Sequence, residues 1–152
     1  MPDLTIRPAR ACDLEAVVGL HADDALGGHG DAWTAQTRPA YAAAFAAIAD
    51  NPHTDLFVAL EAERVVGVFQ LTFRQGIAGR GALKAVLEGV QVRRDRRSAG
   101  IGARMLAEAE ALARRRGASG MQLASGLART GAHRFYARHG YAHSHAGLTK
   151  PL

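Results

Sequence analysis

The 152-residue sequence has a single cysteine, Cys12, and few aromatic residues, which make up 6% of the chain. One cysteine cannot form a disulfide within the chain, and this favours a reducing compartment. No apolar run approaches the length needed to span a bilayer, and residues 1–10 carry charges where a signal peptide needs an apolar core. We therefore expect a cytoplasmic protein with no membrane partner.

Negative charge is also scarce, because 19 Lys and Arg residues oppose 14 Asp and Glu residues, and nearly all the cations are arginines. A net charge of +5 suits a polyanionic partner such as nucleic acid or a phosphate-rich cofactor. A compositional bias toward Ala, Gly and Arg accounts for part of this excess. The length and the apolar content of 48% are those of one globular domain.

Hydrophobic periodicity predicts a mixed α/β fold. Alternating and apolar runs predict strands over 4–9, 82–92, 120–125 and 141–150, and a hairpin over 55–73 that turns at 61–63. Helical spacing predicts helices over 14–20, 38–50, 102–117 and 131–140, with a Gly- and Asp-rich loop over 21–33. Asp13 stands where the first helix needs an N-cap.

An arginine-rich turn joins the strand over 82–92 to the helix that starts near residue 100. Such a helix start presents unpaired N–H groups and the positive end of the macrodipole. Gly100 and Gly102 lack side chains that would block close approach. Four arginines add positive charge: Arg93, Arg94, Arg96 and Arg97. Together these features predict an anion site.

Two common phosphate motifs do not fit this turn. A P-loop needs Lys and Ser or Thr after its second glycine, but Ala103 and Arg104 follow Gly102. A dinucleotide-binding fingerprint needs a third glycine, but Met105 occupies that position. What remains is the pattern Arg97-x-x-Gly100-x-Gly102 after a fourth strand.

This pattern resembles the main signature of the GNAT superfamily of acyl-CoA N-acyltransferases, Gln/Arg-x-x-Gly-x-Gly/Ala. The segment FYARHGY, residues 135–141, is similar to the family's fourth helix. The resemblance implies a mixed, centrally splayed sheet of six or seven strands with about four helices, in one acyltransferase domain over 1–152. The end of the chain also resembles bacterial small-amine N-acetyltransferases of the aminoalkylphosphonate and aminoglycoside type.

The resemblance further implies acetyl-CoA as acyl donor. The signature would hold the pyrophosphate of coenzyme A, and the fourth strand would offer backbone amides to the acetyl carbonyl. Ser125 stands where the family often has an asparagine that touches the pantetheine arm, and Arg138 is a candidate for the 3′-phosphate. The implied cofactor residues are Val90, Gln91, Val92, Arg97, Ser98, Ala99, Gly100, Ile101, Gly102, Ala103, Ser125 and Arg138. The seven histidines show no spacing that completes a metal site, so we expect no metal.

Acetylation of an amine requires a group that takes the amine proton and a group that protonates the leaving thiolate. Glu88 is the only acid in its strand, and the resemblance implies that it takes the amine proton. The alternative is a structural partner for an arginine. Tyr136 is the candidate acid at the CoA sulfur, and the alternative is a core residue with its hydroxyl at the surface.

The loop over 21–33 is a candidate for gripping a cationic substrate, because loops between framework elements often carry specificity. The candidate residues there are Asp23, Asp24, His29 and Trp33. An ordinary solvated loop is the alternative.

The resemblance, taken with these residues, implies an N-acetyltransferase that transfers an acetyl group from acetyl-CoA to a primary amine of a small molecule, by direct attack in a ternary complex. Alternatives are a protein N-terminal or lysine acetyltransferase and a non-catalytic CoA-binding or nucleic-acid-binding module. The arginine runs at 93–97 and 114–116 lack interleaved aromatic residues, so nucleic acid is not favoured. An uncovered sheet edge near the end of the chain predicts a homodimer.

Overall fold

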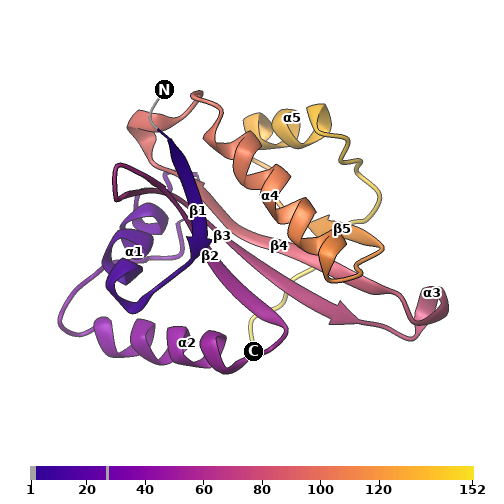
Figure 1. Ribbon diagram of the computed structural model, residues 1–152, viewed down its shortest axis with the longest axis horizontal. Coiled ribbons are helices and arrows are strands. Elements are labelled where there is room, and N and C mark those ends of the chain that lie inside the picture. The colour runs from indigo at the N-terminus through magenta and orange to yellow at the C-terminus, as the bar shows by residue number, and fades with distance from the viewer. Residues whose placement is uncertain (1–2, 27) are drawn as a thin grey trace.

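The computed structural model describes residues 3–26 and 28–152. One sheet has the strand order β1-β2-β3-β4-β5, antiparallel except for the parallel pair β4–β5 (Figure 1). Its strands are β1 Leu4–Pro8, β2 Thr54–Glu61, β3 Arg64–Gln75, β4 Leu83–Val92 and β5 Gly120–Leu123. The helices are α1 Leu14–Ala22, α2 Arg38–Asp50, the one-turn α3 Ala78–Gly81, α4 Ile101–Arg115 and α5 Thr130–Arg138. Short 3₁₀ turns occupy Ala11–Asp13 and Arg94–Arg96.

The expected mixed α/β class is confirmed, and the described chain has five strands rather than six or seven. The predicted hairpin forms, with Ala62 and Glu63 at φ +47° and +62° in its turn. Two successive residues with positive φ are typical of the tight turn that matches the twist of a hairpin. No helix in the described ranges is long and apolar enough to cross a membrane.

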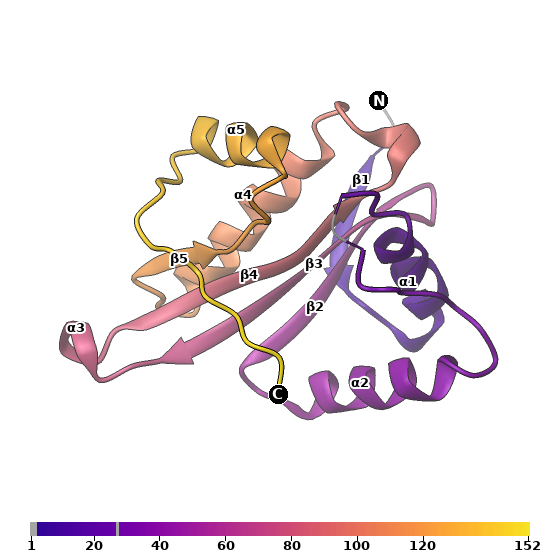
Figure 2. The same cartoon turned by 180° about the vertical axis from the view of Figure 1, so that it is seen from behind.

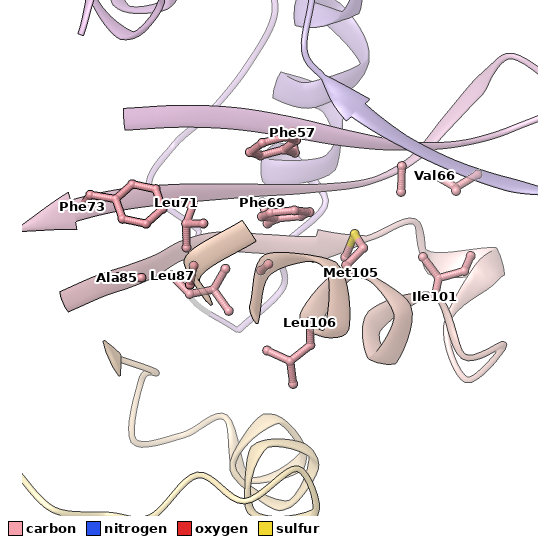
Figure 3. Packing of buried hydrophobic residues seen from close by; sticks show 13 residues of the cluster. Phe57, Val66, Phe69, Leu71, Phe73, Ala85, Leu87, Ile101, Met105 and Leu106 are labelled. Carbon is pink, nitrogen blue, oxygen red and sulfur yellow. The ribbon is translucent and has the colours of Figure 1, made fainter. Parts of the chain in front are cut away.

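The main core lies between the sheet and α4 (Figure 3). The predicted stripe of α4 is buried at Ile101, Met105, Leu106 and Ala109 and faces the stacked rings of Phe57 and Phe69, whose centroids are 5.0 Å apart. α4 packs here against β2, β3 and β4. This close packing fixes the N-terminal end of α4 beside the end of β4.

The opposite face of the sheet is covered by α1, which packs Val17 and Leu20 against Val58, Leu60 and Val68. Since successive strand residues point to opposite faces, Val58 and Val68 face α1 whereas their neighbours Phe57 and Phe69 face α4. In Figure 2 the chain after α1 runs along this face to α2, which lies beside β2. The loop between α1 and α2 therefore stands on the face away from α4.

The sheet opens between β4 and β5. These strands pair only from Lys84–Gly120 to Leu87–Leu123, and β4 then continues alone on that side to Val92. The β3–β4 register shifts between Val68 and Gln70, opposite Gly89, whose φ is +59°. This bulge bends β4 at the point where its pairing with β5 stops.

Two expectations are corrected. The strand predicted over 141–150 does not form, and residues 142–152 are exposed and run past the sheet toward α2 (Figure 2). A strand needs backbone hydrogen bonds to a neighbouring strand, and residues 142–152 make none to the free edge of β5 in the described chain. Asp13 precedes α1, but its carboxylate accepts hydrogen bonds from Arg7 and from the Arg10 N–H instead of capping the helix.

Candidate active site

The turn between β4 and α4 presents an open helix N-terminus. Gly100 caps α4 with φ +82°, and Ser98 also has a positive φ of +62°. A side chain at Gly100 would meet no atom within 4 Å, so the turn is not packed against other elements there. The first N–H groups of α4, at Ile101, Gly102 and Ala103, have no carbonyl partner within the helix. This geometry suits an anion.

The arginines of this turn differ from the expectation that all four add free charge. Arg93 pairs with Asp95, Arg94 with Asp23, and Arg96 bidentately with Glu61 at 2.7 and 2.8 Å. Arg97 has no acidic partner among the described residues, and its Nε donates to the Val92 carbonyl at 3.1 Å. Arg97 is therefore the arginine left to meet an anion, because acids of the turn itself, of the loop after α1 and of the hairpin neutralise the other three.

A small apolar cavity lies where β4, α4 and α5 meet. It is lined by Phe69, Leu87, Val90, Gly102, Met105, Leu106, Phe135 and Tyr136. A Cβ at Gly102 would stand 3.5 Å from the Phe135 ring, an ordinary van der Waals distance, so α5 packs against the start of α4 at this residue. On the face of β4 that packs against the α4 core, Val90 and Val92 are half-buried.

The outer cofactor candidates lie on neighbouring segments. Ser98 and Ala99 are exposed in the turn, Ser125 is half-buried in the loop after β5, and Arg138 is exposed in the last turn of α5. The predicted cofactor residues thus lie on β4, on the glycine turn that follows it and the start of α4, in the loop after β5 and on α5.

Tyr136 is half-buried on α5 beside this cavity. Its ring packs edge-on against Phe135 and Tyr141, with centroids 5.2 and 5.7 Å apart. Burial raises the pKa of Tyr136, and the positive charge of Arg129 opposes that shift. The Tyr141 hydroxyl donates to Glu110 at 3.1 Å, whereas the Tyr136 hydroxyl has no hydrogen-bond partner in the described chain and remains available to a ligand.

Glu88 lies at the bulge of β4, on the face away from α4. It is exposed, directly precedes Gly89 and stands opposite Gln70 of β3. Within the described ranges it makes no ion pair or hydrogen bond, so the alternative of a structural partner for an arginine has no support. The carboxylate is free to accept a proton from a bound molecule.

His21 is a residue of this region that the sequence did not single out. A side chain at Gly89 would stand 3.3 Å from the His21 Cε1 atom, so the ring of His21 lies directly over the bulge. Burial lowers the pKa of His21 despite the opposing charges of Asp31 and Asp24, which leaves the imidazole neutral at pH 7. Its position in the last turn of α1, before an acidic loop, was the only signal.

Asp24 joins three segments across the opening of the sheet. Its carboxylate accepts hydrogen bonds from Gln91 Nε2 at 3.1 Å, from the Leu26 N–H at 3.2 Å and from the guanidinium of Arg129. Burial alone would raise the pKa of Asp24, but the Arg129 contact and the other donors lower it. The carboxylate is therefore charged and already satisfied.

The other substrate candidates are more scattered. Asp23 pairs with Arg94 at 3.1 Å, and His29 is exposed. Trp33 packs against Tyr41 of α2, with centroids 6.1 Å apart, and lies beneath the Arg38 guanidinium. The structure thus ties Asp24 to the end of β4, whereas Trp33 belongs to the packing of α2.

The chain matches a known protein family over most of its length. The model of the GNAT acetyltransferase family matches residues 17–141, which include the opened sheet, the glycine turn and α5. The chain therefore belongs to the GNAT acetyltransferase family. It is an acetyl-CoA-dependent N-acetyltransferase with the GNAT fold, whose sheet has five strands here.

Three individual proteins resemble this chain in sequence or in fold. The chain is 36% identical over 108 residues to aminoalkylphosphonate N-acetyltransferase of Salmonella typhimurium, covering 71% of this chain and 70% of that protein. A Bacillus halodurans protein described as a transcriptional regulator is 34% identical with a TM-score of 0.94, covering 99% of this chain and 100% of that one. An aminoglycoside N-acetyltransferase in complex with CoA shares the fold, with a TM-score of 0.80 and 18% identity over 100% of this chain and 96% of that one.

Proposed function

We propose that this enzyme transfers the acetyl group of acetyl-CoA to a primary amine of a small molecule, by direct attack in a ternary complex. The observation that carries the proposal is the different chemistry of the two sides of β4 at the point where the sheet opens. One side has the open glycine turn and the Tyr136 hydroxyl, and the other has the unpaired Glu88 carboxylate. A thioester and an amine can thus approach each other from opposite sides.

On the cofactor side, the N–H groups at the start of α4 and Arg97 would hold the pyrophosphate of CoA. The backbone of Val90, Gln91 and Val92, which has no β5 partner, would bind the pantetheine arm and the acetyl oxygen. Ser125 and Arg138 would line the outer path. Backbone donors placed at a developing oxyanion stabilise the transition state without reorganisation.

On the acceptor side, Glu88 would take the proton that the amine nitrogen loses as it attacks the thioester carbon. A free alkylammonium has a pKa of about 10, so a base is required at neutral pH. The C–N bond forms, the C–S bond breaks, and Tyr136 gives its proton to the leaving sulfur. Cys12 is not needed as an acyl carrier in this scheme.

A small acceptor is favoured over a protein one. The contacts of Asp24 with Gln91 and Arg129 connect the α1–α2 loop to the β5–α5 loop across the opening. A peptide needs an open groove, whereas this connection narrows the acceptor side. The identity with a curated enzyme named for a small phosphonate amine supports the same class.

A nucleic-acid-binding role is less well supported, although a relative is described as a transcriptional regulator. Arg114 and Arg115 pair with Glu110 and Glu108, and Arg116 pairs with Asp55. Most arginines of both basic runs therefore have acidic partners, which reduces the field available to phosphates. We also propose that the chain acts as a single acyltransferase domain over 1–152, in the cytoplasm and as a homodimer.

The test begins with calorimetric titration of acetyl-CoA into the wild type, Gly100→Glu and Gly100→Ala. Both variants place a side chain at a residue with positive φ, at a cost of about 1 to 2 kcal/mol. Only the glutamate adds bulk and negative charge where the phosphates would lie. We expect binding by the wild type and Gly100→Ala, and loss of binding by Gly100→Glu.

Turnover is then measured as CoA release with a panel of small primary amines and a lysine-containing peptide. Release with small amines and not with the peptide is the expected result. Equal acetyl-CoA affinity of the three proteins would contradict the cofactor site, and turnover of the peptide alone would favour the protein-acetylating alternative.

A further inference from the structure

His21 is held at the opening of the sheet by contacts of its own backbone and of its neighbours. The preceding residue, Leu20, packs into the core between α1 and the sheet. The His21 carbonyl accepts a hydrogen bond from the Asp24 N–H at 3.2 Å, and the Asp24 carboxylate accepts one from Gln91 Nε2 of β4 at 3.1 Å. The end of α1 is thus fastened over residues 89–91 of β4.

The ring of His21 lies against the backbone of β4 at Gly89. The position of a Cβ on Gly89 is 3.3 Å from His21 Cε1 and 3.7 Å from His21 Nε2, so the lack of a side chain at Gly89 leaves room for this edge of the ring. β4 has no β5 partner beyond Leu87. The Cε1–Nε2 edge of the ring therefore stands beside β4 where its pairing with β5 has ended, on the face away from α4.

The ring nitrogens of His21 have no hydrogen-bond partner in the described chain, although the ring is half-buried. Among the described residues, the one fully enclosed side-chain nitrogen or oxygen without a partner is Arg93 Nη1. Both ring nitrogens of His21 therefore keep access to solvent. A neutral imidazole has one N–H donor and one nitrogen that accepts, so the accepting nitrogen is free for a bound molecule.

We propose that His21 binds the acceptor amine, by accepting a hydrogen bond from the amine nitrogen beside Gly89. This inference rests on the proposed function, in which the backbone of residues 90–92 holds the acetyl group. The attacking nitrogen must come within about 3 to 3.5 Å of the thioester carbon, and on the acceptor side this places it next to the ring of His21. Glu88, the residue before Gly89, takes the proton, whereas His21 orients the nitrogen.

A neutral ring suits this role, because an imidazolium has no accepting nitrogen and repels an ammonium. Burial lowers the pKa of His21 against the charges of Asp31 and Asp24, and His29 lowers it further. On β4 the ionisable residue next to the bulge is Glu88, and β3 has no ionisable residue opposite it. The ring therefore keeps its accepting nitrogen at neutral pH, and amine affinity should fall as the pH drops below about 6.5.

The kinetic test removes the ring nitrogens but keeps a ring. His21→Phe has a planar ring of similar size without an accepting nitrogen, whereas His21→Gln retains an accepting atom. His53→Phe, in the exposed turn before β2, is the matched control. We expect His21→Phe to lower kcat/KM for the amine about ten- to a hundredfold, mainly through KM, as for loss of a hydrogen bond to a charged group.

His21→Gln should recover part of this loss, and His53→Phe should match the wild type. The affinity for acetyl-CoA, measured by calorimetry, should stay constant throughout. Circular dichroism and thermal midpoints check that each variant is folded. An unchanged KM for the amine in His21→Phe, or equal losses in His21→Phe and His21→Gln, would overturn the inference, because either result would leave the ring nitrogens without a role.

A readout without turnover separates this inference from the proposed function. The Cε1–H resonance of His21, identified by its absence from the spectrum of His21→Phe, is titrated with pH in the CoA-bound protein. The probe is aminoethylphosphonate, because a relative is named for aminoalkylphosphonates, and ethylphosphonate is the control without the amine. With the amine probe the resonance should shift and its titration midpoint should move to lower pH, because a bound cation disfavours the imidazolium.

A resonance that does not move, or that moves equally with ethylphosphonate, overturns the inference whether or not the protein acetylates amines. A shift with the amine probe alone supports amine binding by His21. If that shift occurs in a protein that transfers acetyl to no amine, the proposed function fails while the binding of the amine by His21 stands.

Discussion

At the scale of single residues, the acids discussed above fall into two groups, those paired with an arginine and the unpaired Glu88. Asp13 is buried and Asp24 is half-buried, and each is paired with an arginine, Arg7 or Arg129. Glu88 is exposed and has no partner in the described chain. A carboxylate that is already paired cannot accept a proton readily, so the unpaired one is the candidate base.

Replacement of Glu88 by glutamine should therefore lower kcat/KM by about 10² to 10⁴, the range expected for loss of a general base. The affinity for acetyl-CoA should not change, because Glu88 lies on the face away from α4. Steady-state kinetics with the best amine and calorimetry with acetyl-CoA measure the two quantities. Glu63→Gln, in the exposed β2–β3 turn, is the control. A Glu88→Gln enzyme that keeps most of its activity would exclude Glu88 as the base.

The contact between Asp13 and Arg7 should make the free energy of unfolding, rather than the activity, depend on pH. The hydrogen bond from Arg7 is the largest cause that lowers the pKa of Asp13, and the pKa of Arg7 is correspondingly raised. A carboxyl with a lowered native pKa stabilises the fold above its unfolded pKa of about 4 and loses that stabilisation as the pH falls through the native value.

The Asp13→Asn protein should thus be less stable than the wild type by about 1.5 to 3 kcal/mol at pH 7. This difference in the free energy of unfolding should shrink below about pH 4. Urea unfolding at several pH values measures it, with the exposed Asp50→Asn as control. A difference that stays constant down to pH 2 would show that the Arg7 contact is not its source.

At the scale of elements, β4 is the strand that makes the site. Its first half pairs with both β3 and β5, and its second half leaves β5 at the Gly89 bulge. Glu88, just before the bulge, lies on the face away from α4, whereas Val90, just after it, lines the cavity beside α5. In the proposed mechanism this single irregular residue separates the candidate base from the cofactor side.

Gly89→Ala should damage this arrangement in two ways. The backbone at φ +59° disfavours any residue with a Cβ, by about 1 to 2 kcal/mol, and the new methyl would stand 3.3 Å from the His21 ring. Gly81→Ala is the matched control, since Gly81 has φ +74° with no atom within 4 Å of an added Cβ. We expect similar losses of stability but a large loss of kcat only in Gly89→Ala. Equal kcat values in the two variants would contradict a role for the bulge.

At the scale of the whole molecule, the sheet ends at β5, which pairs with β4 alone among the described strands. An open strand edge invites pairing with another chain. Residues 142–152 are exposed, and Leu148 is 95% exposed although apolar. These features favour assembly of two copies through this end of the molecule.

Light scattering after size exclusion should therefore give twice the chain mass of 16.1 kDa. Leu148→Asp should shift the protein toward the monomer, because a carboxylate resists burial in an apolar contact. Asp substitution of the equally exposed Leu127 shows whether the effect belongs to the C-terminal segment. A wild-type protein that stays monomeric at its highest soluble concentration would contradict the proposed homodimer.

The sequence by itself determined most of the helices and strands and the glycine turn before α4. Periodicity defined α4 and the hairpin, because burial of one face imposes a regular spacing on apolar residues. The signature Arg97-x-x-Gly100-x-Gly102 located the turn, because its geometry depends on residues adjacent along the chain. Such local rules need no knowledge of distant contacts.

Only the tertiary structure decided which charges are free. Arg96 is neutralised by Glu61 and Asp24 by Arg129, over separations of 35 and 105 residues, and no local pattern contains such pairs. The same holds for His21 over Gly89 and for the segment 141–150, which has strand-like residues but makes no backbone hydrogen bond to the free edge of β5 in the described chain. The stability of an ion pair or of a strand pair depends on both members, and the sequence around one member does not specify the other.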